Sequence, residues 1–228
     1  MNAAEATKRR RKIALFGGTF DPVHAGHIRV AEVALRKFGL DAIYFVPSAH
    51  PPHKKIRPLA EFIHRYAMVA LACEGRRRYV PSLAEGPVQG KEAPTYYSVD
   101  TVRRFREQFP GEHIYFILGA DSFLEIGKWR AYEDLLEACD FIVAGRPGFS
   151  LEALRMAIPP RMLAPKGGAK GNVIEMRKSQ VNMLGTVKSH VSSTEIRRKR
   201  RAGFGIGGLT PRAVEEYIVK QHLYVSER

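Results

Sequence analysis

Residues 13–27 read Ile-Ala-Leu-Phe-Gly-Gly-Thr-Phe-Asp-Pro-Val-His-Ala-Gly-His, and this stretch decides the fold. The apolar run Ile13 to Phe16, followed at once by Gly17-Gly18, is typical of a buried parallel strand that ends in a tight loop. From His24 to Phe38 the apolar residues recur at helical spacing, and Gly39 follows as a carboxyl-terminal cap would. Strand, glycine loop and helix in this order predict the first unit of a parallel α/β sheet.

The same alternation continues along the chain. It predicts strands at 42–46, 78–84, 113–118, 139–144 and 173–176, and helices at 58–73, from Thr95 or Ser98 to 109, from Ser192 or Ser193 onward, and at 210–222. The fold class is therefore α/β: a Rossmann-like doubly wound parallel sheet with helices on both faces and a C-terminal helical segment. Ligands bind outside the carboxyl ends of such strands, so the candidate site lies just after Phe16, Val46, Leu118 and Ala144.

The length of 228 residues predicts one domain, over residues 12–225, preceded by a disordered basic leader at 1–11. Pro159-Pro160 and Gly167-Gly168 interrupt the pattern, so about 150–187 is expected to be a poorly defined insert. No window approaches 18 consecutive apolar residues, and residues 1–12 lack the apolar stretch of a secretory signal. The two cysteines fit no metal or disulfide spacing, and we expect a cytoplasmic protein without a membrane partner.

The charge balance is strongly basic. Lys and Arg number 37 against 23 Asp and Glu, which gives a formal net charge of +14. Much of the excess lies in three clusters, Lys8 to Lys12, Arg76 to Arg78 and Arg197 to Arg201. This excess indicates a polyanionic partner, which could be nucleic acid, a phospholipid surface or a small phosphorylated substrate. Nucleic acid is disfavoured, because aromatic residues do not alternate with Lys and Arg and no nucleic-acid motif is found.

The two histidines of the opening stretch carry the chemistry. His24 and His27 are three residues apart at the start of a helix, so they share one face, and Gly26 keeps that face open. Backbone amides after the glycines, the helix amino terminus and two imidazoles suit a phosphate whose charge grows in a transition state. The chain has neither a G-x-x-x-x-G-K-[ST] loop nor a G-x-G-x-x-G fingerprint. The alternative is a helix that merely begins with histidines.

Further motifs follow this stretch in order. They are Pro51-Pro52-His53-Lys54, Tyr97-Ser98-Val99-Asp100-Thr101, Gly119-Ala120-Asp121-Ser122 with Trp129 beyond it, Arg146-Pro147-Gly148, Ser192-Ser193-Thr194-Glu195-Ile196-Arg197, and a closing helix with Pro211, Val214, Tyr217-Ile218 and Leu223-Tyr224. With G-G-T-F-D-P-V-H-x-G-H, they make the chain resemble the bacterial nicotinate-nucleotide adenylyltransferases, H-x-G-H members of the nucleotidyltransferase superfamily. The resemblance covers roughly residues 12–148 and 188–225, with Ser98 in place of the usual Thr.

The resemblance implies a reaction, in which ATP and nicotinate mononucleotide give deamido-NAD and pyrophosphate. The mononucleotide phosphate would attack the α-phosphorus of ATP in line, with no covalent enzyme intermediate, so catalysis is positioning and charge stabilisation. Mg²⁺ would be carried with the ATP phosphates, and no protein metal ligand is expected. ATP and nicotinate mononucleotide are thus the implied partners, and a homo-oligomer is left open.

The resemblance also assigns roles to residues. It implies catalytic roles for His24 and His27. It implies ATP contacts for Gly17, Gly18, Thr19, Phe20, Gly119, Asp121, Ser193, Thr194 and Arg197, and mononucleotide contacts for Lys54, Tyr97, Ser98, Trp129 and Arg146. Several of these residues also have an ordinary alternative: Ser193 or Thr194 and Asp121 as helix caps, Lys54 as a solvated loop residue, and Trp129 as a core residue.

Rival activities remain open. By resemblance, pantetheine-phosphate adenylyltransferase is the nearest, but it commonly has Thr at the first histidine position and lacks the P-P-H-K and G-A-D…W elements. A nicotinamide-selective enzyme differs only in one substituent of the ring. The stretches around Trp129 and Tyr97-Ser98 hold no dedicated acidic acceptor for the amide NH₂, whose burial without a partner costs about 1–3 kcal/mol. The sequence therefore predicts a preference of about 100-fold or more for nicotinate.

Overall fold

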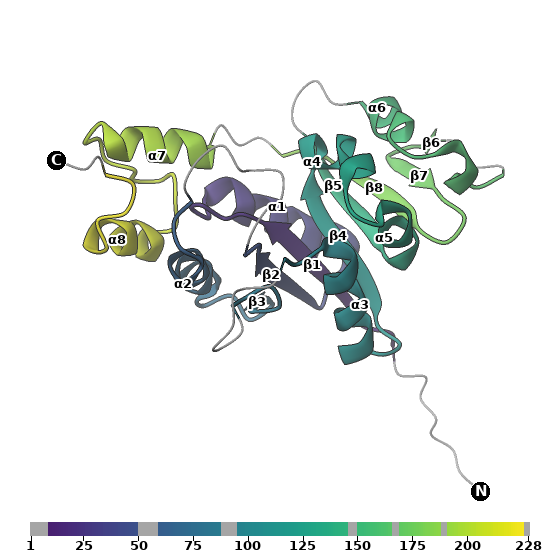
Figure 1. Cartoon of the computed structure of the whole chain (residues 1–228), viewed down its shortest axis with the longest axis horizontal. Coiled ribbons are helices and arrows are strands. Elements are labelled where there is room, and N and C mark those ends of the chain that lie inside the picture. The colour runs from purple at the N-terminus through teal and green to yellow at the C-terminus, as the bar shows by residue number, and fades with distance from the viewer. Residues whose placement is uncertain are drawn as a thin grey trace, which may run out of the picture.

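A parallel sheet forms the centre of the molecule (Figure 1). The computed structural model describes residues 9–49, 59–87, 95–145, 150–165, 169–187 and 191–225. Over these residues the strands follow the order β3-β2-β1-β4-β5-β8-β7-β6. They are β1 (Lys12–Gly18), β2 (Ala42–Pro47), β3 (Tyr79–Pro81), β4 (His113–Gly119), β5 (Asp140–Gly145), β6 (Ala169–Lys170), β7 (Val173–Glu175) and β8 (Gln180–Thr186).

Strands β1 to β5 and β8 run parallel, whereas β6 and β7 form an antiparallel edge. The chain order reverses between β1 and β4, which are hydrogen-bonded neighbours in the middle of the sheet. Such a reversal opens a crevice at the carboxyl ends of the strands, where doubly wound folds bind their ligands. The predicted doubly wound α/β class is confirmed.

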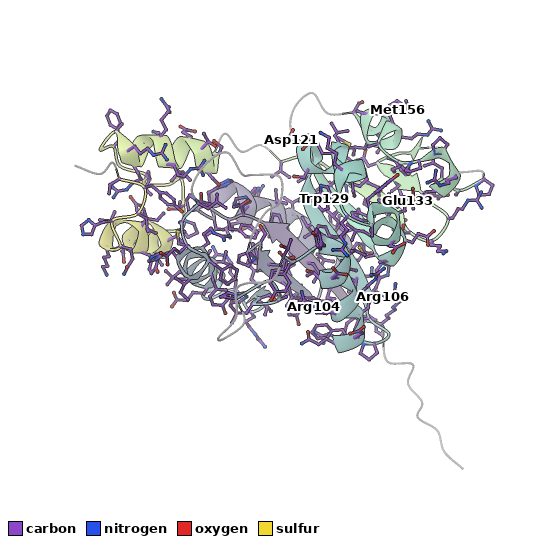
Figure 2. The ribbon with its side chains drawn as sticks, in the orientation of Figure 1. Arg104, Arg106, Asp121, Trp129, Glu133 and Met156 are labelled. Atoms are coloured by element: carbon purple, nitrogen blue, oxygen red, sulfur yellow. The ribbon has the colours of Figure 1, made fainter. Side chains whose placement is uncertain are left out.

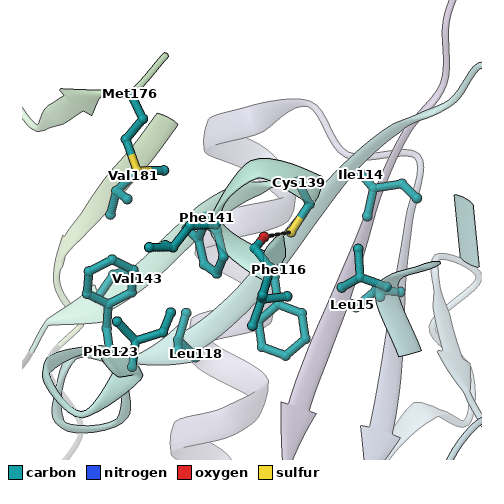
Figure 3. Packing of buried hydrophobic residues seen from close by; sticks show 14 of the residues in the cluster. Leu15, Ile114, Phe116, Leu118, Phe123, Cys139, Phe141, Val143, Met176 and Val181 are labelled. Carbon is teal, nitrogen blue, oxygen red and sulfur yellow. Dashed lines mark hydrogen bonds between the residues drawn. The ribbon is translucent and has the colours of Figure 1, made fainter. Parts of the chain in front are cut away.

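Alternate residues of each central strand supply two separate cores. On one face, Phe116 and Leu118 of β4 and Phe141 and Val143 of β5 pack with buried residues of the helices that follow β3, β4 and β5 (Figure 3). On the other face, Tyr115 and Ile117 of β4 join the first two helices and the last two. The helices are α1 (Ala25–Phe38), α2 (Phe62–Cys73), α3 (Ser98–Gln108), α4 (Ala120–Leu124), α5 (Tyr132–Ala138), α6 (Leu151–Met156), α7 (Ser193–Arg201) and α8 (Arg212–Lys220), with 3₁₀ turns η1 (Ile126–Lys128) and η2 (Pro160–Met162).

Helix α1 matches its sequence signals at both ends. His24 is the N-cap residue in an extended conformation, and Gly39 ends the helix in the left-handed region with φ of 60°. Its buried stripe includes Ile28, Ala31 and Ala34, which pack under the first strands. The predicted helix is therefore confirmed, and its first turn lies directly after the glycine loop.

Other boundaries move by a few residues. The strand expected at 139–144 begins at Asp140, because Cys139 ends the preceding turn as the C-cap of α5. The strand expected at 78–84 is shorter, and the helix expected from Pro58 begins at Phe62 with Glu61 as its N-cap. Pro58 lies outside the described residues. Within the described chain, no helix is long and apolar enough to cross a bilayer.

The region from about 150 to 187 adds ordered structure to the sheet. The strand expected at 173–176 is present as β7, but the sequence pattern did not reveal β8. Strand β8 pairs parallel with β5 and extends the main sheet. Strand β7 pairs antiparallel with β8, and β6 pairs antiparallel with β7. In Figure 1 these strands and α6 form the end of the sheet opposite to α7 and α8.

Candidate active site

The loop after β1 is shaped by aromatic rings. A Cβ atom on Gly17 would lie 3.0 Å from the Phe116 ring, and one on Gly18 would lie 3.1 Å from the Phe20 ring. Both contacts are closer than real Cβ atoms normally make, so only glycine fits without displacing a ring. The two glycines thus allow the carboxyl end of β1 to lie close to the rings of Phe116 and Phe20. The loop that follows β1 leads directly to His24.

His24 and His27 hold each other in a reciprocal capping arrangement. The backbone N–H of His27 donates to His24 Nδ1 at 3.4 Å, and the backbone N–H of His24 donates to His27 Nδ1 at 3.2 Å. Their rings stack with centroids 3.7 Å apart. Because each Nδ1 accepts a hydrogen bond, the proton of each neutral imidazole sits on Nε2. The pair therefore presents two Nε2–H donors from the first turn of α1, as phosphate recognition requires.

The buried ring of Phe20 packs against the His27 ring of this pair. It is 1% exposed, adopts a φ of 47°, and its ring meets that of His27 edge to face at 5.0 Å between centroids. The sequence assigned Phe20 to ATP. With its side chain buried, any contact of Phe20 with a nucleotide has to come from its backbone, and its ring instead fixes the orientation of His27.

A buried polar cluster holds the loop in place. Asp21 is 1% exposed, and its carboxylate accepts hydrogen bonds from the Tyr224 hydroxyl at 2.8 Å and the Ala60 N–H at 3.2 Å. The Arg197 guanidinium lies 3.6 Å from the same carboxylate and also donates to the Asp21 carbonyl. Burial, followed by the charge of Asp21, raises the pKa of Tyr224, so its hydroxyl keeps the proton that it donates. The loop before His24 is thereby tied to both ends of the C-terminal segment.

Arg65 of α2 ties the same loop to its neighbours. The side chain is 2% exposed and donates to the carbonyl oxygens of Thr19, Ser48, Ala49 and Ala60 at 2.7–3.1 Å. Burial lowers the pKa of Arg65 below its usual value, whereas the nearby Asp21 carboxylate acts in the opposite direction. One guanidinium thus connects the loops that follow β1 and β2 with the segment that precedes α2.

The amino end of α7 lies against the histidine loop. Ser192 is the N-cap residue, and its Oγ accepts from the Glu195 N–H at 3.2 Å. Ser193 Oγ donates to the Pro22 carbonyl at 3.0 Å, and Arg197 donates to the exposed Thr194 Oγ1 at 3.0 Å. Ser193 and Arg197 therefore contact the loop that precedes His24, Thr194 lies next to them, and the hydrogen bonds of Ser193 and Arg197 brace that loop.

A cavity of 420 Å³ opens beside the glycine loop. Its apolar walls come from Val46, Tyr96, Tyr97, Phe116, Leu118 and Trp129, and its polar walls from Gly17, Gly18, Thr19, Ser48, Ser98, Gly119 and Ser122. The charged lining residues are Glu85, Glu125, Lys128 and Arg130. The cavity thus brings together segments that follow β1, β2, β3 and β4, which is the crevice expected at the reversal of strand order.

Trp129 follows η1 and belongs to both the core and the cavity. Its half-buried ring meets Phe116 edge to face at 6.5 Å between centroids, and the residue also lines the cavity. Figure 2 labels Trp129 near the middle of the molecule. Tyr97, the N-cap residue of α3, and Ser98, its first residue, line the same cavity. The Arg130 guanidinium lies 4.5 Å from the centroid of the Tyr97 ring. The residues expected around the mononucleotide ring are therefore brought together.

Two acidic residues line this cavity, Glu125, which lies four residues before Trp129, and Glu85, which lies twelve residues before Tyr97. Glu125 is exposed and pairs with Lys128 at 2.8 Å. Glu85 is 8% exposed, and burial raises its pKa, whereas the hydrogen bond from Thr101 and the charge of Arg104 act in the opposite direction. The sequence argument for a nicotinate preference, that the stretches around Trp129 and Tyr97-Ser98 hold no acidic acceptor, is therefore incomplete.

The remaining expected residues fall into two groups. Gly119 lines the cavity and Asp121 lies exposed in the first turn of α4, both at the carboxyl end of β4. Lys54 and Arg146 lie outside the described residues. Among the described residues, no cluster of three or more His, Cys, Asp or Glu side chains could hold a metal ion. Cys73 and Cys139 are buried free thiols, and burial raises the pKa of both.

Sequence reasoning missed Arg65, Tyr224 and Glu85. A signal for Arg65 was present, because it shares the buried stripe of α2 with Met68, Val69 and Ala72. A charge at such a position needs buried partners. Tyr224 appeared only as part of the closing-helix motif, and Glu85 had no local signal, since their partners Asp21 and Thr101 come from distant segments.

Known proteins resemble the chain over nearly its whole length. The family model described as cytidylyltransferase-like matches residues 15–199. A probable nicotinate-nucleotide adenylyltransferase of Pelobacter propionicus is 40% identical over 215 residues, covering 93% of this chain and 98% of that protein. One of Geobacter sulfurreducens, under the same name, is 39% identical over 218 residues, covering 95% and 99%.

Solved structures resemble the fold. Plasmodium falciparum nicotinic acid mononucleotide adenylyltransferase complexed with APC aligns with a TM-score of 0.68 at 20% identity, covering 94% of this chain and 97% of that one. The same protein complexed with NaAD aligns with a TM-score of 0.67 at 20% identity. At this identity the likeness supports the arrangement of helices and strands.

Proposed function

The chain belongs to the nicotinate-nucleotide adenylyltransferases of the cytidylyltransferase-like family, and from this premise we propose how its residues carry out the reaction. The enzyme transfers the adenylyl group of ATP to nicotinate mononucleotide and yields deamido-NAD and pyrophosphate. The observation that carries the proposal is the position of the His24–His27 pair, one loop away from a cavity with an aromatic wall.

The mononucleotide phosphate attacks the α-phosphorus of ATP in line, and pyrophosphate leaves. A phosphate oxygen is already a nucleophile, so no side chain has to form a covalent intermediate. Negative charge grows on the transferred phosphoryl group, and the two Nε2–H groups of His24 and His27 donate to it. Because each Nδ1 is held by a backbone N–H, the donors are oriented before the substrate arrives.

The mononucleotide occupies the cavity. Its pyridine ring lies against Trp129 with its edge toward Tyr97 and Ser98, since these supply the aromatic and polar walls. Its phosphate points toward the loop of Gly17, Gly18 and Thr19, which lines the same cavity and precedes the histidines, and the backbone of this loop also meets ATP, as the resemblance implies. A mononucleotide held at two ends loses the freedom that would otherwise slow an in-line attack.

ATP binds next to the mononucleotide, between the carboxyl end of β4 and the amino end of α7. Its ribose meets the carboxyl end of β4 at Gly119 and Asp121, and its leaving pyrophosphate lies at the amino end of α7 near Ser193 and Thr194. Arg197 contributes positive charge there while its hydrogen bonds hold the Asp21 loop. Mg²⁺ enters with the ATP phosphates as part of the substrate, held by phosphate oxygens and water.

A pyrophosphate-release assay with ATP and each mononucleotide tests this proposal. Release with nicotinate mononucleotide, and formation of deamido-NAD in equal amount, is the expected result. Release with phosphopantetheine in its place, or none with either pyridine mononucleotide, would refute it. We also infer that the enzyme works in the cytoplasm, where its buried thiols Cys73 and Cys139 stay reduced.

A further inference from the structure

Glu85 stands in the cavity without belonging to any of the motifs that identified the family. It follows β3, is 8% exposed, and lines the same 420 Å³ cavity as Trp129, Tyr97 and Ser98. Buried carboxyl groups are rare unless they are paired, so a carboxyl in a ligand cavity calls for a reason.

Two hydrogen bonds fix Glu85 and its loop against α3. Thr101, itself 1% exposed, donates from Oγ1 to Glu85 Oε1 at 2.8 Å. The Tyr96 hydroxyl donates to the Gly86 carbonyl at 2.8 Å. Thr101 thus engages Oε1, and among the contacts of the described residues Oε2 is the carboxyl oxygen available to a ligand.

The charged groups around Glu85 come from two elements. Arg104 of α3 acts on it directly, and its guanidinium lies 5.0 Å from the centroid of the Tyr96 ring. From the opposite wall come Lys128, paired with Glu125, and Arg130, which lies over the Tyr97 ring. Burial outweighs the hydrogen bond from Thr101 and the charge of Arg104, so the pKa of Glu85 is raised above its ordinary value.

The two states of this carboxyl suit different pyridines. A neutral carboxyl donates a hydrogen bond to the carboxylate of nicotinate, and a hydrogen bond to a charged acceptor is strong. An ionised carboxyl repels that carboxylate but accepts a hydrogen bond from the NH₂ group of nicotinamide. Resting on the function proposed above, we propose that Glu85 is the specificity-determining residue that separates nicotinate from nicotinamide mononucleotide, by donating its proton to the nicotinate carboxylate.

The proposal predicts a selectivity that depends on pH. Nicotinate binding favours neutral Glu85, so the advantage of nicotinate is full below the pKa of Glu85 and is lost as pH rises through it. The measurement is the ratio of kcat/KM for the two mononucleotides between about pH 5 and pH 9, the range that buried glutamates reach. Titrations of the histidines and of the substrate phosphate affect both substrates and cancel in the ratio. The ratio should fall about tenfold or more, the change that one pKa unit of coupling gives.

Three variants sharpen this test. Glu85→Gln removes the titration but keeps a donor of the same shape, so the ratio should no longer vary with pH. Thr101→Val removes a hydrogen bond that favours the ionised form, so the fall should move to higher pH. Glu125→Gln is the matched control, because it changes the other carboxyl that lines the cavity and should leave the fall where it was. A fall that persists in Glu85→Gln, or that Glu125→Gln abolishes, overturns the proposal.

Proton uptake gives a readout that is independent of turnover. Calorimetric titration of the wild-type enzyme with each mononucleotide, in two buffers of different ionisation enthalpy, counts the protons taken up on binding. Above the pKa of Glu85, nicotinate mononucleotide should take up more protons than nicotinamide mononucleotide, and equal uptake overturns the proposal. If nicotinate mononucleotide turns over with a ratio that is flat in pH, this inference alone fails. If neither mononucleotide turns over, the proposed function fails and the inference falls with it.

Discussion

Replacing Arg65 with methionine should cost both stability and turnover. Methionine has a similar length and no donors, so the change removes four hydrogen bonds to backbone carbonyls on three segments. The carbonyl oxygens of Thr19, Ser48, Ala49 and Ala60 would lose a charged donor inside the protein. Hydrogen bonds to charged groups contribute about 1.5–3 kcal/mol each, but removing the guanidinium also removes the cost of burying its charge.

These opposing effects set the expected size of the loss. A buried carbonyl left without a donor costs about 1–3 kcal/mol, and with the removed cost of burying the charge set against four such groups we expect a net loss of about 3–5 kcal/mol for Arg65→Met. That is a large part of the roughly 5–15 kcal/mol that stabilises a folded domain. With a urea dependence of about 2.5 kcal/mol per molar, the unfolding midpoint should fall by about 1–2 M. Arg65→Lys keeps the charge but not the fork of donors, and should lose an intermediate amount.

Urea unfolding followed by circular dichroism measures this loss, and pyrophosphate release at low urea measures its effect on turnover. Because Arg65 holds the loop that carries Gly18 and Thr19, kcat should fall even where the variant remains folded. Ile63→Ala, an exposed position on the same helix, is the matched control and should change neither quantity appreciably. A midpoint within about 0.3 M of the wild type, together with an unchanged kcat, would refute the role assigned to Arg65.

Three further predictions concern the substrates and the charge. His24→Ala or His27→Ala should lower kcat by about 100-fold or more with a small change in ATP affinity, because each removes a donor to charge that develops in the transition state; near-normal turnover would exclude that role. Trp129→Ala should raise KM for nicotinate mononucleotide but not for ATP in steady-state kinetics, and an unchanged mononucleotide KM would limit Trp129 to its contact with Phe116. Binding to generic duplex DNA, measured by fluorescence anisotropy, should be weak and collapse between low and physiological salt; tight, salt-resistant binding would revive a nucleic-acid role.

The fold could be predicted wherever local sequence signals and tertiary packing agree. The first strand, the glycine loop and α1 carry an apolar run, an N-cap at His24 and a left-handed glycine at 39, each of which acts within a few residues. Strand β8 lacked such a signal. It contains Gln180, Asn182 and Gly185, and buried Asn182 is tolerated because its side chain donates to the Phe141 carbonyl across the sheet at 3.1 Å. That partner exists only in the folded chain.

The residues of the candidate site also differ in whether a local sequence signal identifies them. His24 and His27 could be assigned because their spacing alone places them on one helical turn. Glu85 and Arg65 could not, because a carboxyl or a guanidinium looks solvent-exposed in a sequence until the groups that surround it are known. Helix α4 shows the same limit on a small scale, since its five residues are too few for a periodic pattern.

The hydrogen bond between Asp21 and Tyr224 joins residues that are 203 positions apart. At a synthesis rate of about 5–20 residues per second, the ribosome makes the tyrosine roughly 10–40 s after the aspartate. During that interval the growing chain contains the histidine loop but not the hydroxyl that completes it. A truncated messenger RNA, or proteolysis that removes Tyr224, should therefore give a protein that keeps most of the sheet but has little activity. The histidine loop is therefore completed only after the residues around position 224 have been synthesised and have folded back onto it.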